Sequence, residues 1–229
     1  MKKIAILQSN YIPWKGYFDM IAAVDEFILY DDVQFTKNDW RNRNKIKTQN
    51  GVQWLSVPVG QDINRLIREV ELKDEHWQSK HWSTICHSYK RAPYFKEVAT
   101  KLEPLYLERK YTHLSQLNRG LIEFVCDLLG IKTIISNSWD YALVDGQTER
   151  LVDLCKQAGG EEYISGPSAR NYLNEALFED RGIKLAWFDY NGYPEYPQLW
   201  GDFTHGVSIL DLLFNCGKDA PHYMKYVSR

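Results

Sequence analysis

The chain has 229 residues, of which 44% are hydrophobic, so it can bury the core of one large domain. Its formal net charge of −2 argues against a protein that binds polyanions with its whole surface. The first residues do not resemble a signal peptide, and no apolar run is long enough to span a bilayer.

The first predicted elements form a strand, a helix and a second strand. Residues 3–7 are short and apolar, which is typical of a buried strand. We expect a helix to begin at Pro13 and to continue through Phe18 and Ile21, because proline suits a first helical turn. Residues 26–30 (EFILY) predict the second strand. This order favours a parallel sheet with a right-handed crossover.

A β-hairpin is predicted next, with strands at 41–48 and 53–58 around Asn50-Gly51. Asn-Gly is the strongest short hairpin signal, because both central positions of a type I′ turn need a positive φ. A two-residue loop at this dipeptide places Lys47 opposite Trp54 and Lys45 opposite Ser56. One face of the hairpin then carries cations and a tryptophan, and the other can pack inward.

Residues 76–128 are predicted to be mostly helical. Pro93 interrupts the first helix, Pro104 lies within or near the end of a second, and a third runs from about Leu114 to Leu129 and stops at Gly130. We interpret the stretch from about 74 to 129 as a helical insertion between two strands.

The alternation of strands and helices then returns. We expect strands at 131–135, 162–165 and 183–188, and helices at 147–158, 168–178 and 207–214. The predicted fold class is α/β, with a parallel-centred Rossmann-like sheet, a β-hairpin and a helical insertion.

The segment QSNYIPWKGYFDMI, residues 8–21, follows the first strand and is unusually polar and aromatic for a plain connection. In open α/β sheets, ligands bind beyond the carboxyl ends of the strands. We therefore expect this turn to share one crevice with the loops after two other strands. The candidate residues are Gln8, Tyr11, Trp14, Gly16, Tyr17, Asp31, Asp32, Gln34, Ser165 and Ser168.

Within the turn, Gly16 would allow close backbone approach, and the aromatic side chains would stack on a ring. The alternative is that Trp14 and Tyr17 simply pack on the hairpin. Neither GxGxxG nor GxxxxGK[ST] occurs, so the sequence predicts neither a dinucleotide fingerprint nor a P-loop.

A basic stretch, KNDWRNRNKIK at residues 37–47, is the second candidate site. Its cations, Lys37, Arg41, Arg43, Lys45 and Lys47, repel one another unless an anion lies over them. Arginine suits bidentate phosphate contacts, so we expect a phosphate or another anion here. The alternative is an edge strand whose charges prevent aggregation. The patch is local and the net charge is negative, so we do not expect nucleic acid.

Two further features have both a functional and a structural interpretation. Ser168 and Arg170 lie where a turn enters a helix, which suits either phosphate binding or ordinary capping. His81 lies beside an apolar helical stripe, as either a catalytic group or a core-edge residue, and His205 has the same uncertainty. The cysteines, Cys86, Cys126, Cys155 and Cys216, form no CxxC pair, so we expect no metal.

Four segments together resemble the WbqC-like proteins of bacteria: QSNYIPWKGYFDMI, DDVQFTKNDWRNRNKIKT, YISGPSARNYL and YPQLWGDFTHGVSILDLLFNCG. The resemblance covers nearly the whole chain, and implies one domain over residues 1–229. It also implies a cytoplasmic bacterial protein that acts on sugar-nucleotide or related precursors of surface polysaccharide (O-antigen). The separated cysteines and the lack of a signal peptide independently predict a cytoplasmic protein with reduced thiols. A fainter similarity to nucleotidyltransferases of the pantothenate synthetase type is limited, because residues 8–17 contain no histidine.

Two functions remain open from the sequence. The first is an enzyme that binds a nucleotide or nucleotide-sugar and transfers an acyl or similar group to a sugar amine, or activates a small acid. A nucleotide such as ATP is then the candidate cofactor, Lys37, Arg41, Arg43 and Lys45 hold phosphates, and Asp31, Asp32 or His81 moves protons. The second is a non-catalytic module that binds a nucleotide or glycan. Either is compatible with a homo-oligomer, and converging acid and base groups would favour the enzyme.

Overall fold

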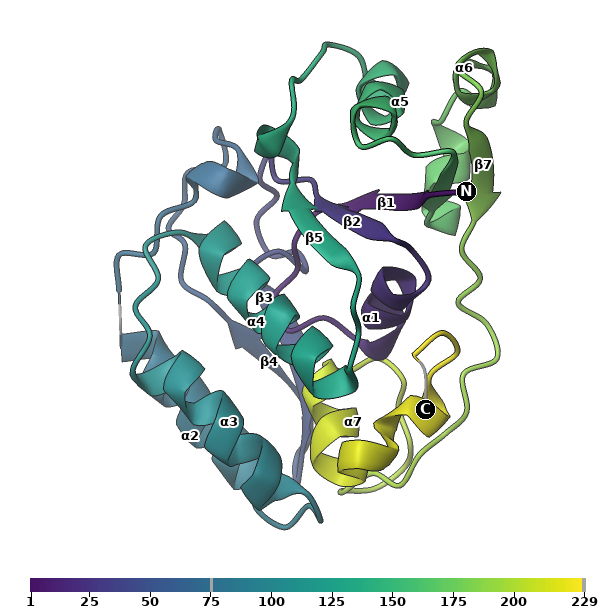
Figure 1. Cartoon of the computed structure of the whole chain (residues 1–229). Coiled ribbons are helices and arrows are strands. Elements are labelled where there is room, and N and C mark those ends of the chain that lie inside the picture. Colours follow the sequence, from purple (N-terminus) through teal and green to yellow (C-terminus); the bar gives the residue numbers. More distant parts are fainter. Residues whose placement is uncertain (75, 228–229) are drawn as a thin grey trace.

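The computed structural model describes residues 1–74 and 76–227 (Figure 1). Five parallel strands form its central sheet, in the order β5-β2-β1-β6-β7. Their bounds are β1 Lys3–Leu7, β2 Glu26–Leu29, β5 Ile134–Asn137, β6 Glu162–Ser165 and β7 Lys184–Trp187. The predicted parallel pairing of the first two strands is confirmed, and β5 begins three residues later than expected.

The order of the strands places a topological switch between β1 and β6. The chain builds the sheet outward from β1 to β2 and β5, and then crosses to the other side for β6 and β7. Strand β1 pairs with β2 over four residues, but with β6 only at Lys3↔Glu162 and Ile4↔Tyr163. The carboxyl halves of β1 and β6 are therefore not joined by a ladder.

Helices cover both faces of the sheet, as parallel sheets require. Ile4 and Ile6 of β1 share one core with α5 (Gln147–Gln157) and α6 (Glu175–Asp180). Ala5, between them, faces the other core, which holds α1 (Lys15–Ala22), α4 (Leu114–Leu129) and α7 (Ile209–Cys216). Because successive side chains of a strand point to opposite faces of the sheet, β1 contributes side chains to both cores.

The hairpin forms where it was predicted, from β3 (Arg43–Thr48) and β4 (Gly51–Ser56), but its register differs. Lys45 pairs with Trp54 rather than with Ser56, and Lys47 pairs with Val52. Only Gly51 has a positive φ, of 96°, while Asn50 does not, so the loop is not the expected type I′ turn. The observed pairing differs from the predicted pairing by two residues, and such a shift keeps each side chain on the same face of the hairpin. The cations therefore still share the face of Trp54, as predicted.

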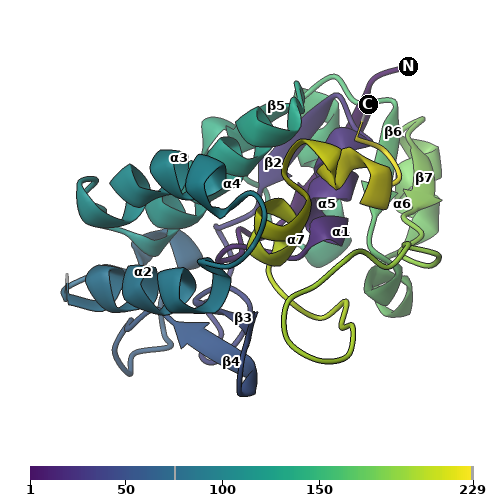
Figure 2. The same cartoon turned by 90° about the horizontal axis from the view of Figure 1, so that it is seen from below.

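The helices predicted after the hairpin are α2 (His76–Tyr89), α3 (Phe95–Leu107) and α4, which ends at Gly130 with a φ of 70°. Pro104 lies inside α3. Figure 2 shows α2 beside the hairpin and α3 beyond α2, both on the side of the molecule away from β6, β7 and α6.

The prediction of one continuous helix over residues 168–178 is wrong. A 3₁₀ helix over Pro167–Asn171 comes first, and α6 starts only at Glu175. Asn174 separates the two, because its side chain accepts a hydrogen bond from the backbone of Ala176 and caps α6. Further 3₁₀ turns cover Ile67–Glu69, Ser138–Asp140 and Gly217–Tyr223.

Candidate functional site

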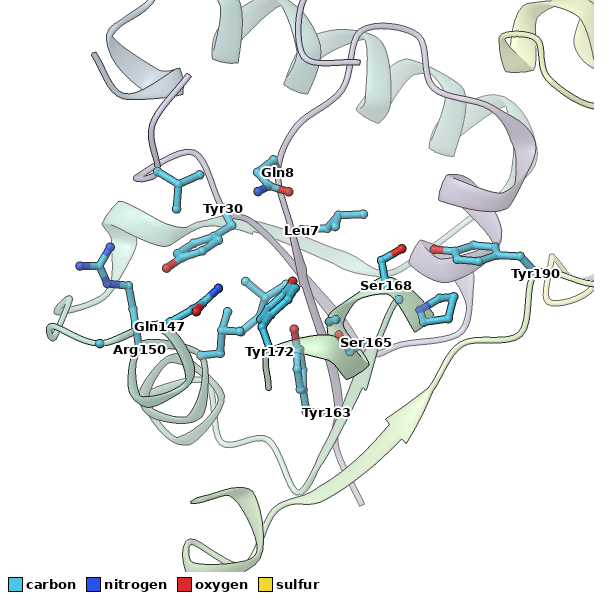
Figure 3. A pocket seen from close by; sticks show the side chains of 17 residues that line it. Leu7, Gln8, Tyr30, Gln147, Arg150, Tyr163, Ser165, Ser168, Tyr172 and Tyr190 are labelled. Atoms are coloured by element: carbon cyan, nitrogen blue, oxygen red, sulfur yellow. The ribbon is translucent and has the colours of Figure 1, made fainter. Parts of the chain in front are cut away.

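A crevice of about 690 Å³ opens between β1 and β6, at the carboxyl ends of the strands (Figure 3). The β1–β6 ladder ends at Ile4, so Leu7 and Ser165 diverge and line the cavity instead of pairing. This is the switch point at which open α/β sheets bind ligands. The lining also includes Gln8, Tyr30, Val33, Gly146, Gln147, Arg150, Ser168, Tyr172 and Tyr190.

Arg150 supplies the positive charge of the crevice. Its Nε donates to the carbonyl of Val144 at 2.7 Å, and its Nη1 donates to the carbonyl of Asp32 at 3.5 Å. Its nearest carboxylate, on the fully exposed Asp145, lies 3.8 Å from Nη2. Its guanidinium is thus held in place by backbone oxygens, which leaves most of its charge uncompensated.

The N-terminus of α5 faces the same cavity. Gly146, with a φ of 99°, precedes the helix, and no side chain caps its first turn. The unpaired N–H groups of a helix start and the helix dipole favour an anion. Glu149 belongs to this turn, and its carboxylate folds back against Gly146 while it lines a different cavity. Gly146, Gln147 and Arg150 therefore form one wall of the crevice, and its positive side chain is Arg150.

Tyrosines form much of the rest of the crevice. Tyr30 and Tyr172 are partly exposed, whereas Tyr163 is buried and stacks on Phe178 at 5.1 Å. Burial raises the pKa of the Tyr30 phenol, and the neighbouring Arg150 opposes this effect. The phenols of Tyr30 and Tyr172 are thus neutral hydroxyls with ring faces open to a ligand.

Of the residues predicted from the sequence, the structure brings Gln8, Ser165 and Ser168 together in this crevice. Arg170 is exposed, stacks on Trp187 at 5.1 Å and does not line it. Sequence reasoning missed Tyr30, Gln147, Arg150, Tyr172 and Tyr190. Tyr30 and Gln147 had a usable signal, since they end a predicted strand and start a predicted helix.

The two predicted aspartates lie behind the crevice. Asp31 is buried and accepts hydrogen bonds from the N–H and Oγ of Ser9, at 2.8 and 2.7 Å. Burial raises its pKa to about 6, and the bonds from Ser9 limit the rise. Asp32 accepts a hydrogen bond from Ser138 and forms an ion pair with Arg68 at 2.9 Å. Gln34 also lies outside the crevice lining, and its amide donates to the carbonyl of Ile63.

His81 lies in a buried chain of polar side chains. Its Nδ1 is 2.8 Å from the hydroxyl of Tyr11, which is 2.7 Å from that of Tyr106. Burial lowers the pKa of His81 to about 4, although a hydrogen bond to the backbone of Ser56 opposes this. Tyr17 is also buried, and donates to the carbonyl of Gln8 at 3.0 Å. These groups join the opening turn to α2 and the hairpin.

The opening turn itself is strained. Ile12 has a φ of 37°, which is rare for a β-branched residue, and is only 1% exposed. Asn44 holds this conformation, because its Nδ2 donates to the carbonyls of Tyr11 and Ile12 at 3.0 and 2.9 Å. A side chain at Gly16 would meet the Trp14 ring. The turn thus directs Gln8 to the crevice and Trp14 to the rings of Tyr190 and Tyr193.

The predicted cations do not form one phosphate site. Lys37 reaches Gln61, and Arg41 donates to Asn10 at 2.6 Å. Lys47 is buried and donates to Gln198 at 2.9 Å. Arg43 and Lys45 remain on the hairpin face, against Trp54.

Beside this face lies a smaller cavity of about 250 Å³. It is lined by Asn10, Pro13, Trp14, Trp40, Asn44 and Gly206.

Among the described residues, no helix is long and apolar enough to cross a membrane, and no cluster of three or more His, Cys, Asp or Glu side chains is arranged for a metal ion.

Comparison with known proteins identifies a family and a similar protein. Residues 8–223 match the model of the WbqC-like protein family, which confirms the resemblance drawn from the four sequence segments. A protein of Mycobacterium tuberculosis (strain ATCC 25618 / H37Rv), described as uncharacterized protein Rv1507c, is 55% identical over 228 residues, or 99% of each chain. No solved structure matches.

Proposed function

Because the chain belongs to the WbqC-like protein family, we propose that it binds a nucleotide or nucleotide-sugar in the β1–β6 crevice, within the metabolism of bacterial surface-polysaccharide precursors. One observation carries the proposal. The start of α5 and the Arg150 guanidinium face a cavity that also holds the open tyrosine rings. A phosphorylated ligand with a ring complements both features.

The proposed contacts follow from the chemistry of the lining. Phosphate oxygens accept from the first N–H groups of α5 and from Arg150. A base or sugar ring packs against Tyr30 and Tyr172. Ligand hydroxyls bond to neutral polar side chains other than the tyrosines, which are Gln8, Gln147, Ser165 and Ser168.

The lining also bears on the choice between an enzyme and a binding module. None of the described residues that line the crevice is a carboxylate or a histidine. Asp31, Asp32 and His81 are not part of the lining, and each has internal partners. Binding without catalysis is therefore the function that this geometry supports best. Transfer of an acyl or similar group to a sugar amine, or activation of a small acid, is the second candidate.

A thermal-shift screen of ATP, UDP and UDP-sugars, followed by calorimetric titration of the best ligand, tests the binding proposal. Arg150→Ala removes charge-assisted hydrogen bonds and should weaken binding by about 10- to 100-fold. Arg170→Ala is the matched control, because Arg170 is close in the fold but outside the lining. Equal affinities for wild type and Arg150→Ala would refute the assignment.

Mass spectrometry separates the two candidate functions. The protein is incubated with the bound nucleotide-sugar, ATP and a small acid such as acetate. An unchanged nucleotide-sugar supports the binding module, and a new acylated or adenylated mass supports the transferase or ligase.

A further inference from the structure

We propose that the smaller cavity and the hairpin face beside it form a second binding site, for an acidic sugar ring. The site goes beyond the crevice proposal, because its residues lie on the other side of an aromatic wall. Trp14 lines the smaller cavity, Tyr190 lines the crevice, and their ring centroids are 5.4 Å apart.

Two exposed tryptophans form the floor of this site. Trp40 is 42% exposed and Trp54 is 38% exposed, and their ring centroids lie 5.4 Å apart. Leaving two large apolar rings in water forgoes the stabilisation that burial would give. The C–H face of a pyranose is apolar and flat, so it covers such rings while its hydroxyls stay in water.

Two cations border the same rings. The Arg43 guanidinium lies 4.2 Å from the Trp54 ring centroid, and Lys45 Nζ lies 4.9 Å from it. Neither forms an ion pair within the described part of the chain, and Arg43 Nε is buried there without a hydrogen-bond partner. An anionic group on the ligand would pair with these two cations.

The cavity limits the ligand to a small size. Its volume of about 250 Å³ is below the roughly 300–1,000 Å³ typical of pockets for drug-sized ligands, so it takes a single ring. The side chain of Asn44 is engaged by backbone groups. Asn10 uses its Oδ1 for Arg41, and its amide nitrogen has no partner among the described residues. Asn10 is therefore a polar group available to a sugar hydroxyl.

An acidic sugar fits these features better than an isolated phosphate. Inorganic phosphate would engage Arg43 and Lys45 but would leave Trp40 and Trp54 uncovered. A neutral sugar would cover the rings but leave both cations unpaired. A ring that bears a carboxylate satisfies both.

Two-dimensional NMR of the indole N–H groups, assigned by single Trp→Phe variants, tests the site. The probes are D-glucuronate, D-glucose and inorganic phosphate. We expect saturable shifts of Trp40 and Trp54 with D-glucuronate, and affinities about tenfold weaker for the other two probes. The double variant Arg43→Gln/Lys45→Gln should reduce the affinity for glucuronate to that for glucose, and Trp54→Ala should abolish both.

The matched control is Trp139→Ala, because Trp139 is 37% exposed and lies 6.0 Å from the Arg68 guanidinium. This variant should bind glucuronate as wild type does. Arg150→Ala should also leave glucuronate binding unchanged, so that failure at the crevice and failure at this site are distinguishable. The proposal is overturned if glucose and glucuronate bind equally. It is also overturned if the Trp40 and Trp54 signals shift with protein concentration alone, which would make this face a self-association surface.

Discussion

Replacing His81 by glutamine tests whether the buried polar chain beneath the opening turn serves stability. Glutamine keeps a polar group within reach of the Tyr11 hydroxyl but cannot take up a proton. Because His81 is buried, its pKa falls from the ordinary 6.5 to about 4. The gap between these values corresponds to about 3 kcal/mol of free energy of unfolding.

The sign follows from which state binds the proton first. As the pH falls through 6.5, the unfolded chain protonates its histidine while the folded protein keeps His81 neutral. His81 therefore lowers the free energy of unfolding progressively between pH 6.5 and 4. Asp31 acts in the opposite direction. Its pKa is raised from 3.8 to about 6, so the folded state protonates first and gains stability as the pH falls from 6 towards 4.

The effects of His81 and Asp31 on the free energy of unfolding therefore nearly cancel in the wild-type protein below pH 6. In His81→Gln, only the effect of Asp31 remains. Urea unfolding at pH 7, 6, 5 and 4.5 measures the difference between wild type and His81→Gln. We expect this difference to move by about 2 kcal/mol in favour of the variant between pH 7 and 4.5. The double variant His81→Gln/Asp31→Asn is the control and should lack both effects. A difference that is constant with pH would refute the assignment of a buried, neutral His81.

Two further substitutions test the opening turn. Asn44→Ala leaves the carbonyls of Tyr11 and Ile12 without their donor and should lower the free energy of unfolding by about 2–4 kcal/mol, as measured in urea, whereas the exposed Asn50→Ala should change it little. An equal effect of both asparagine variants would contradict this role. Gly16→Ala should destabilise by about 1–3 kcal/mol, although alanine normally favours a helix, because its Cβ would lie 2.3 Å from a Trp14 ring atom. Gly120→Ala in α4 is the control, since its nearest contact is 3.4 Å, and thermal unfolding that ranks the two variants equally would contradict the steric argument.

Much of the fold could be predicted from the sequence because its strands are short apolar runs between polar turns. The cationic face of the hairpin was also predictable, because a displacement of the pairing by two residues leaves every side chain on the same face. The register was not predictable, because it depends on whether Asn50 or only Gly51 takes a positive φ. The break at Asn174 was missed, because a capping asparagine inside a helical pattern reads like any polar residue.

The candidate site was predicted only in part. Gln8 and Ser165 were found, because they directly follow predicted strands and the carboxyl-end rule applies to them. Arg150 and Tyr172 were missed, because they line the crevice only as a result of the strand order β5-β2-β1-β6-β7. This order cannot be deduced from a single sequence. Tyr11 and Tyr17 were expected near a ligand, but their rings complete the core instead.

The switch between β1 and β6 also has a consequence for biosynthesis. The partners Ile4 and Tyr163 are 159 positions apart, so the ribosome has released most of the chain before this pairing is possible. Until then β1 pairs on one side only, and its free edge is open to any other unpaired strand. The crevice likewise does not exist until the last-made strands dock. A ligand that contacts both walls of the crevice therefore favours the finished sheet over the half-assembled one, by mass action.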